Sequence, residues 1–194
     1  MLTLKHMIRD GATPEQCGIL LDRMSHDERM GQLVGLGTAE MDRLYYSIEG
    51  HRLLDMDTFV PGHVEPLREV IHDGVNTLPA FRHFQKRFVR PEDASWDALF
   101  GYNHQWYSWW TGPGYFVARR GTPADPIVVD YIEPARARDP RWPELAPSHV
   151  RLGRFIYANT VDRMRRVSEH VTIGAAFKAD KDPMGVFFML ARRD

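Results

Sequence analysis

The chain has little cysteine, little lysine and no long hydrophobic run. Cys17 is the only cysteine among 194 residues, which excludes a disulfide within the chain and any zinc site built from cysteines. We expect Cys17 to be a buried free thiol on a helix near the N-terminus. No apolar stretch approaches the length of a membrane span. Residues 1–10 are mixed and polar, without the charged segment and following apolar segment of a secretory signal peptide. We therefore expect a cytoplasmic protein with no membrane span.

Motifs of several enzyme classes are also missing. The chain has no Gly-x-Ser-x-Gly motif, no Walker loop and no His-Glu-x-x-His spacing. Gly35 and Gly37 suggest a dinucleotide-binding loop, but Glu40 stands where the third glycine is needed. The net charge is −1, and its asymmetry between the two halves is modest, so we expect no nucleic-acid partner. Four lysines against 21 arginines is a bias more typical of a GC-rich genome than of a function.

Aromatic residues are concentrated in one block. Residues 96–116 hold nine of them, including four of the five tryptophans: Trp96, Phe100, Tyr102, Trp106, Tyr107, Trp109, Trp110, Tyr115 and Phe116. Such side chains carry the largest apolar areas, and Tyr and Trp add a polar tip. The block either fills a core or lines a pocket for a flat, apolar ligand. In the second case Asn103, His104 and Gln105 would orient the ligand.

The first half of the chain has helical patterns. Thr13 before Pro14 and Ser25 before His26-Asp27-Glu28 are helix-start signals. They predict helices over Pro14–Met24 and from Ser25 to about Leu36. Thr38 is expected to cap a helix over Ala39–Ile48, and further helices are expected over Pro66–Asp73 and Leu78–Phe88. The last of these rests on apolar residues at helical spacing.

The second half has strand patterns. Strands are expected over Tyr115–Arg119, Ile127–Ile132, Arg151–Tyr157, Val171–Phe177 and Val186–Leu190, with a short helix over Thr160–Ser168 and an irregular Glu133–Ser148. Several strands are apolar on both faces, as in a small closed barrel covered by helices. We predict an α+β fold in which a helical section (1–91) packs on an antiparallel β-barrel or curved sheet (92–194) as one compact unit.

The C-terminal 39 residues carry a resemblance. The run IYANTVDRMRRVSEHVTIGAAFKADKDPMGVFFMLARRD resembles the end of small bacterial lipocalin-like proteins of the GXWXG type, which have no known function, and more faintly plastid fibrillin-type domains. The GXWXG motif itself is missing, since Trp109-Trp110 and Gly112-Pro113-Gly114 do not match it. The resemblance implies a calycin-like barrel that holds an apolar small molecule, and it implies no reaction.

Two residues are candidates for acid–base chemistry. Asp130 lies mid-strand between Val128 and Ile132, and a carboxylate inside a barrel would have a shifted pKa, with Arg119, Arg154 or Tyr157 as partners. An ordinary ion pair, or an outward position, explains Asp130 as well. His104 is the second candidate because it lies beside the aromatic block.

Metal and cofactor sites have weak signals. Glu69 and His72 have the Glu-x-x-His spacing of di-iron bundles, but only one copy occurs, so we expect no metal. Haem on a single axial histidine, His104, is conceivable; otherwise we expect no cofactor. Arg163 and Arg166 would share a helix face and could bind an anionic head group, or simply be solvated.

Three functions remain open. The first is binding of a hydrophobic small molecule in the barrel, with the expected ligand-binding residues Tyr102, Trp106, Trp109, Trp110, Tyr115, Arg119, Tyr131 and Phe177. The second is a cofactor-independent isomerase, cyclase or hydrolase in the same pocket, with Asp130 or His104 as the acid–base group. The third is a protein–protein interaction module with the aromatic block exposed. The oligomeric state cannot be read from the sequence.

Overall fold

The N-terminal part of the structure is helical, as its capping signals predict. The computed structural model describes residues 3–79, 82–93, 97–104, 114–131 and 160–193. Its first four helices are α1 (Leu4–Arg9), α2 (Pro14–Asp22), α3 (His26–Val34) and α4 (Thr38–Ser47). Thr13 and Ser25 each form a capping box, with Gln16 and Glu28 respectively. The predicted starts of α2 and α3 are therefore confirmed, and Cys17 is a buried free thiol.

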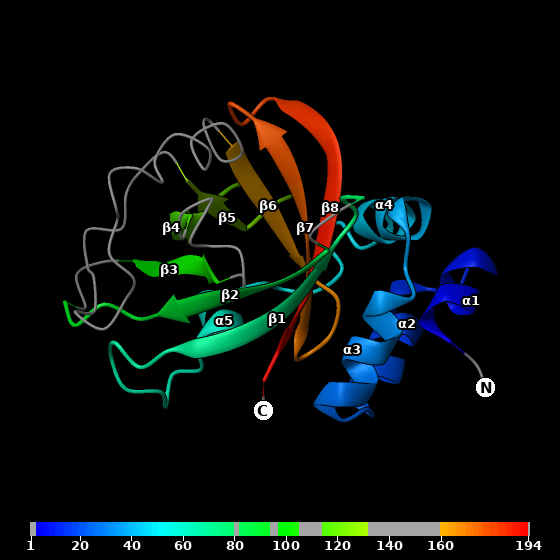
Figure 1. Cartoon of the computed structure of the whole chain (residues 1–194), viewed down its shortest axis with the longest axis horizontal. Coiled ribbons are helices and arrows are strands. Elements are labelled where there is room, and N and C mark those ends of the chain that lie inside the picture. The colour runs from blue at the N-terminus through cyan, green and yellow to red at the C-terminus, as the bar shows by residue number, and fades with distance from the viewer. Residues whose placement is uncertain (1–2, 80–81, 94–96, 105–113, 132–159, 194) are drawn as a thin grey trace.

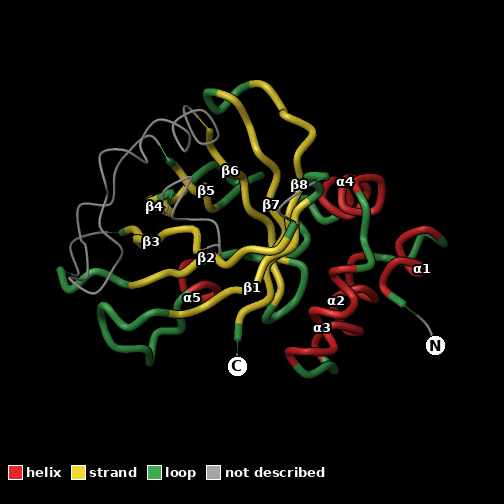
Figure 2. Tube along the Cα trace, in the orientation of Figure 1, coloured by secondary structure: helices red, strands yellow, loops and turns green. Residues whose placement is uncertain are grey.

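Eight described strands form a closed antiparallel barrel in simple sequence order. They are β1 (Val70–Asn76), β2 (His83–Val89), β3 (Ala98–His104), β4 (Tyr115–Arg120), β5 (Ile127–Asp130), β6 (Thr160–Arg166), β7 (Val171–Lys178) and β8 (Asp182–Arg192). Strand β1 pairs with β2 on one side and with β8 on the other, which closes the barrel. Figures 1 and 2 show the strands curving around one interior, with α1–α4 packed outside on one flank. The predicted α+β barrel with helices against it is confirmed.

Three predicted helices are wrong, because strands occupy their ranges. The ranges 66–73, 78–88 and 160–168 contribute to β1, β2 and β6. The error over 78–88 has a simple cause: Phe84 and Phe88 are four residues apart, a spacing that places two side chains on one face of a helix and also on one face of a strand. Pairing with neighbouring strands then outweighs local helical preference. The predicted strands over 115–119, 127–132, 171–177 and 186–190 are present; the predicted strand over 151–157 lies outside the described residues.

The inner face of the barrel is identified by one apolar cluster. Its strand members come from β2, β3, β4, β5, β6 and β8, and side chains from strands all around a barrel can meet only inside it: Phe88, Leu99, Phe116, Ala118, Ile127, Val129, Met164, Phe188 and Leu190. A second cluster joins the helices to the outer face of β1, β7 and β8, with Val75, Ile173 and Met189 among its members. Because strand side chains alternate between faces, these two sets fix the orientation of every neighbouring residue.

A short helix, α5 (Met56–Phe59), closes one end of the barrel. The Phe59 ring lies 4.9 Å from the Phe88 ring, centroid to centroid. His72 Nε2 donates to the Phe59 carbonyl oxygen at 2.9 Å, and Arg192 Nη1 donates to the Thr58 carbonyl oxygen at 2.7 Å. These bonds satisfy carbonyl groups at the end of α5 that the helix itself leaves unpaired. Helix α5 thus packs on the interior at the end where β1 begins and β2 ends.

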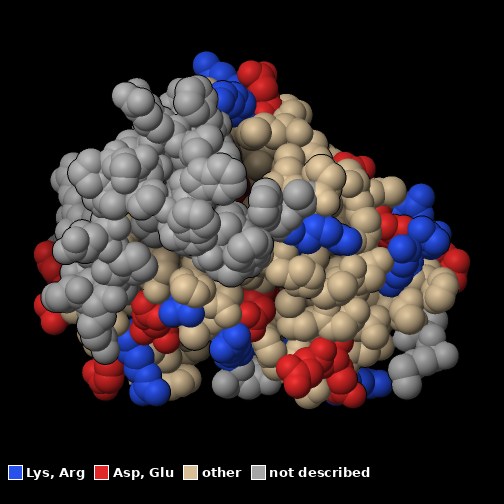
Figure 3. Space-filling view, in the orientation of Figure 1, with Lys and Arg blue, Asp and Glu red and all other residues tan. Residues whose placement is uncertain are grey.

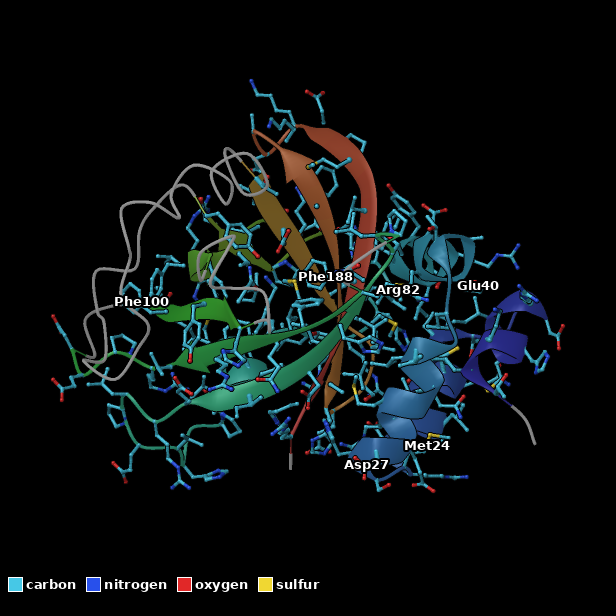
Figure 4. All side chains as sticks on the ribbon, in the orientation of Figure 1. Met24, Asp27, Glu40, Arg82, Phe100 and Phe188 are labelled. Atoms are coloured by element: carbon cyan, nitrogen blue, oxygen red, sulfur yellow. The ribbon has the colours of Figure 1, made fainter. Side chains whose placement is uncertain are left out.

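Arg165 joins helix α4 to the barrel wall. Its side chain is 6% exposed, and its Nε donates to Asp125 Oδ1 at 3.0 Å. Nη1 donates to the Tyr45 carbonyl oxygen at 2.8 Å, and Nη2 donates to Glu49 Oε2 at 3.0 Å. A cation at the C-terminal turn of a helix also interacts favourably with the helix dipole. In Figure 4, Arg82 extends toward the same helical layer, where its Nη2 donates to the Leu36 carbonyl oxygen at 2.9 Å.

We expect Arg165→Met to destabilise the fold by about 3 kcal/mol, because breaking a buried pair leaves the Asp125 carboxylate inadequately compensated. Chemical denaturation monitored by circular dichroism measures this change. Arg120→Met is the matched control, since Arg120 is 66% exposed and pairs with an equally exposed Asp97; its unfolding midpoint should scarcely move. Equal effects of the two substitutions would show that Arg165 does not hold α4 on the barrel.

His72 should make the stability of the protein depend on pH. Burial, opposed by its bond to the Phe59 carbonyl, lowers the pKa of His72 from 6.5 to about 3. The folded state therefore stays neutral while the unfolded state takes up a proton, so stability is present above pH 6.5 and is lost as the pH falls toward 3. We expect His72→Gln to reduce the slope of this loss by about 1.4 kcal/mol per pH unit, the value for one proton. Denaturation curves recorded between pH 3 and 6.5 measure the change of the unfolding free energy with pH. His63→Gln is the matched control, since His63 is exposed, and it should leave this pH dependence unchanged.

Candidate functional site

Four polar side chains meet inside the barrel. Lys86 Nζ donates to Asn103 Oδ1 at 3.1 Å and to the Tyr131 hydroxyl, and it lies 3.2 Å from Asp162 Oδ2. The Tyr131 hydroxyl donates to Asp162 Oδ2 at 3.0 Å and accepts from Asn103 Nδ2 at 3.2 Å. We call Lys86, Asn103, Tyr131 and Asp162 the inner polar cluster. All three N–H groups of the ammonium have acceptors, as a buried cation requires.

Strand alternation places each member of this cluster on the inner face. Lys86 lies between Phe84 and Phe88 along β2, two residues from each, and its register partner on β3 is Asn103. Asp162 is two residues before Met164, and Tyr131 is two residues after Val129. Met164 and Val129 belong to the inner apolar cluster, so their neighbours at this spacing share that face.

Aromatic rings surround the ammonium group. Lys86 Nζ lies 4.8 Å from the ring centroids of both Phe116 and Tyr131, 5.1 Å from that of Phe188 and 5.9 Å from that of Phe84. These separations are within the range of cation–π attraction, which is strengthened by desolvation. Figure 4 shows Phe188 among the barrel strands. The cation is therefore held by ring faces as well as by hydrogen bonds.

Three glycines make room for these rings. The register partners of Phe84, Phe116 and Phe188 are Gly74, Gly101 and Gly174 respectively. A Cβ atom at any of the three glycines would lie 2.7 Å or less from the partner ring. Each ring thus covers the backbone of the glycine opposite it, and a larger residue there would force the ring away from the lysine.

Burial acts on both charged members of the cluster. Desolvation lowers the pKa of Lys86 against the opposing attraction of Asp162. Desolvation likewise raises the pKa of Asp162, against the stabilising effects of Lys86 and Tyr131. The two changes bring the proton affinities of the amine and the carboxylate closer together. Proton transfer between them is therefore easier than between the same groups in water.

Some inner-face polar atoms have no hydrogen-bond partner among the described residues. They are Thr160 Oγ1, Thr172 Oγ1 and His72 Nδ1. Thr160 is 5% exposed and lies on the same strand face as Asp162, two residues earlier. An unpaired hydroxyl in such a place costs free energy unless something else bonds to it. Thr160 is the one of the three that adjoins the inner polar cluster along its own strand.

The structure places only one described member of the predicted binding set on the inner face. That residue is Tyr131, which belongs to the inner polar cluster. Tyr102 and Tyr115 pack with Val117 in an outer cluster, and Phe177 packs on the outer face beneath Arg163, whose guanidinium carbon is 4.1 Å from the ring centroid. Trp106, Trp109 and Trp110 lie outside the described residues.

The predicted acid–base candidates also lie away from the inner face. Asp130 follows Val129 on β5 and so points outward, where Arg119 Nη2 donates to its Oδ2 at 2.9 Å. His104 lies on the outer face of β3 and is exposed. Partial desolvation of its ring, together with the nearby Arg87 cation, lowers the pKa of His104. Catalysis by either residue stays a prediction, but neither lies inside the barrel.

The expected anion site on a shared helix face is wrong, since Arg163 and Arg166 lie on strand β6. Three residues apart on a strand, they project from opposite faces. Arg163 Nε donates to Asp180 Oδ1 at 3.1 Å, and Arg166 Nε donates to the Ser168 carbonyl oxygen at 3.1 Å.

Sequence reasoning missed Lys86 and Asp162 as site residues, whereas Asn103 was expected to orient a ligand. Lys86 was hidden by the helical interpretation of residues 78–88, and Asp162 by the helical interpretation of residues 160–168. One signal was available for Lys86: it is one of only four lysines, and it is flanked at two-residue spacing by Phe84 and Phe88. Alternation of that kind predicts a lysine on an apolar strand face.

We expect Lys86 and Asp162 to be strongly coupled in stability. Lys86→Met should cost about 3 kcal/mol, because it leaves a buried carboxylate without its cation. Adding Asp162→Asn should recover a large part of that loss, since the amide oxygen of the new side chain still accepts from Tyr131 and carries no charge. Denaturation of both single variants and the double variant gives the coupling free energy. Simple additivity of the two effects would contradict a direct charge pair.

No protein-family model, no curated protein and no solved structure matches this chain. Among the described residues, no helix has both the length and the apolarity needed to cross a membrane. Within the same ranges, no group of three or more His, Cys, Asp or Glu side chains is placed to hold a metal ion. In Figure 3 the positively and negatively charged side chains of the described residues are intermixed. The interior cluster is thus the strongest chemical feature of the described part.

Proposed function

We propose that this protein binds a small molecule inside its barrel. The ligand would be mostly apolar and carry one polar group. The observation that supports this most directly is the inner polar cluster, which is enclosed by aromatic rings and adjoined by the Thr160 hydroxyl, a group without a hydrogen-bond partner among the described residues. Ligand sites in proteins are commonly apolar with a few convergent polar groups. The resemblance of the C-terminal segment to lipocalin-like proteins agrees with this proposal.

The size of the barrel is suitable for one small ligand. Eight-stranded barrels are either filled by side chains or hold a single small molecule. Here the end covered by α5 is filled, since Phe59 packs on Phe88 there. The inner polar cluster belongs to the opposite half: Asn103 and Tyr131 come at the ends of β3 and β5, and Asp162 near the start of β6. A ligand would approach from this half.

The side chains around the site indicate whether the polar group of the ligand is charged or neutral. Lys86 and Asp162 neutralise each other, so an additional full charge would upset their balance. Thr160 offers a hydroxyl that can both donate and accept a hydrogen bond. A neutral oxygen, as in an alcohol, aldehyde or ketone, fits such a setting better than a carboxylate or an ammonium.

The first experiment is to identify what the purified protein carries and what it binds. Solvent extraction followed by mass spectrometry should release a small apolar molecule with an oxygen function. Titration calorimetry with naphthylmethanol and decanol, two apolar alcohols of different shape, should show binding at one site per chain. A protein that yields no such molecule and binds neither alcohol does not have this function.

Thr160→Val tests the position of the polar group. We expect the dissociation constant for the bound alcohol to rise about fivefold, which corresponds to one net hydrogen bond of about 1 kcal/mol. Stability should stay unchanged or increase, because an unpaired buried hydroxyl is removed. Thr172→Val is the matched control: Thr172 is also buried and unpartnered among described residues, but lies in the half near α5. Equal affinity changes in the two variants would contradict placement of the ligand beside Thr160.

A further inference from the structure

We infer that Lys86 is a covalent binding residue that forms an imine with an apolar aldehyde or ketone. This inference rests on the proposed function and names the substrate class of the same site. It is carried by geometry: a single amine lies inside an aromatic cage, in contact with a carboxylate and a phenol. Each of those two groups can move a proton, and imine formation requires proton movements to and from both nitrogen and oxygen.

The location of Lys86 sets it apart from the other lysines. The chain has four, and Lys5, Lys178 and Lys181 are partly or fully exposed. Lys86 is 1% exposed, and its pKa is lowered by burial. An amine is nucleophilic only when neutral, and desolvation in apolar surroundings is an established way to activate a lysine toward carbonyl groups.

Asp162 can supply and recover the proton. Its Oδ2 lies 3.2 Å from Lys86 Nζ, so a proton passes directly from the ammonium to the carboxylate, giving a neutral amine and a carboxylic acid. The amine nitrogen attacks the carbonyl carbon, a C–N bond forms, and the nitrogen's proton moves to the oxygen to give a neutral carbinolamine. The Asp162 acid then protonates the departing hydroxyl, which leaves as water while the nitrogen lone pair forms the C=N bond.

The product keeps the charge balance of the starting state. Before the reaction an ammonium faces a carboxylate, and afterwards a protonated imine faces the same carboxylate. The overall change is one carbonyl compound in and one water out, with no oxidant or reductant. The rings of Phe116, Tyr131 and Phe188 surround the cation in both states. Exclusion of water by this cage would slow hydrolysis of the imine.

Cyanoborohydride trapping tests the inference, because this reagent reduces an imine to a stable secondary amine. The protein is incubated with naphthaldehyde and reductant at mildly acidic pH, where exposed lysines are protonated. Intact-mass and peptide-mapping mass spectrometry should show one adduct per chain, on Lys86. The triple variant Lys5→Arg, Lys178→Arg, Lys181→Arg should retain it, whereas Lys86→Met should lose it. Asp162→Asn should slow trapping at least tenfold while its circular dichroism spectrum stays native.

The alcohol naphthylmethanol separates failure of the inference from failure of the proposed function. It has the same ring system as the aldehyde but cannot form an imine. Binding of the alcohol together with no adduct, or with adducts confined to the N-terminal α-amine, Lys5, Lys178 and Lys181, overturns covalent binding at Lys86 and leaves the barrel as a noncovalent site. Failure of both the alcohol and the aldehyde to bind removes the proposed function as well. Because mapping is done on the unmodified sequence, the result does not depend on whether Lys86→Met folds.

Discussion

Closure of the barrel between β1 and β8 is the constraint on which the rest of the structure depends. The pairing of His72 with Arg192 and of Gly74 with Leu190 removes both sheet edges and separates an inside from an outside. Once the wall is closed, each inner side chain must find its partners across the interior. The four residues of the inner polar cluster, on or directly after β2, β3, β5 and β6, do so at the same point, although they are far apart in the sequence. Their hydrogen bonds then become part of what fixes the register of those strands.

The interior is arranged in layers along the barrel axis. At the α5 end the layer is apolar and closed, with Phe59 on Phe88 and with His72 kept neutral by burial. Toward the other half each ring lies on the backbone of the glycine opposite it, and the rings together surround the Lys86 ammonium. A glycine at these positions weakens a strand by itself. The three glycines lie opposite rings that all face the Lys86 ammonium. Their loss of strand stability therefore accompanies the packing of these rings around the inner polar cluster.

Much of the helical section could be predicted from the sequence, because a helix start is a local event. Thr13 and Ser25 cap α2 and α3 through residues three positions away. The presence of a barrel could also be predicted, since several strands are apolar on both faces. Strands β1, β2 and β6 could not, because a four-residue spacing such as that of Phe84 and Phe88 satisfies both the helix and the strand periods. Only pairing with neighbouring strands decides between a helix and a strand.

The candidate site was less predictable than the fold. Side chains alternate between the two faces of a strand, so a shift of one residue would place Asp130 inside the barrel instead of Tyr131. Lys86 and Asp162 become neighbours only when β2 and β6 stand on facing parts of one barrel, and no local pattern near either residue contains that relation.

A buried ion pair in a barrel can be purely structural, and the choice between that role and a chemical one rests on its surroundings. An apolar pair of similar volume is often as stable as a buried ion pair or more so, which makes stability a weak reason for placing Lys86 and Asp162 there. A structural pair also does not require a phenol between its two charges. Nor does it require a nearby hydroxyl that, among the described residues, has no partner. Tyr131 and Thr160 add groups that can exchange protons or bind an oxygen, beside an amine whose charge is destabilised by burial. The Tyr131 and Thr160 hydroxyl groups are therefore better explained by binding of a ligand with a neutral oxygen than by the stability of the fold.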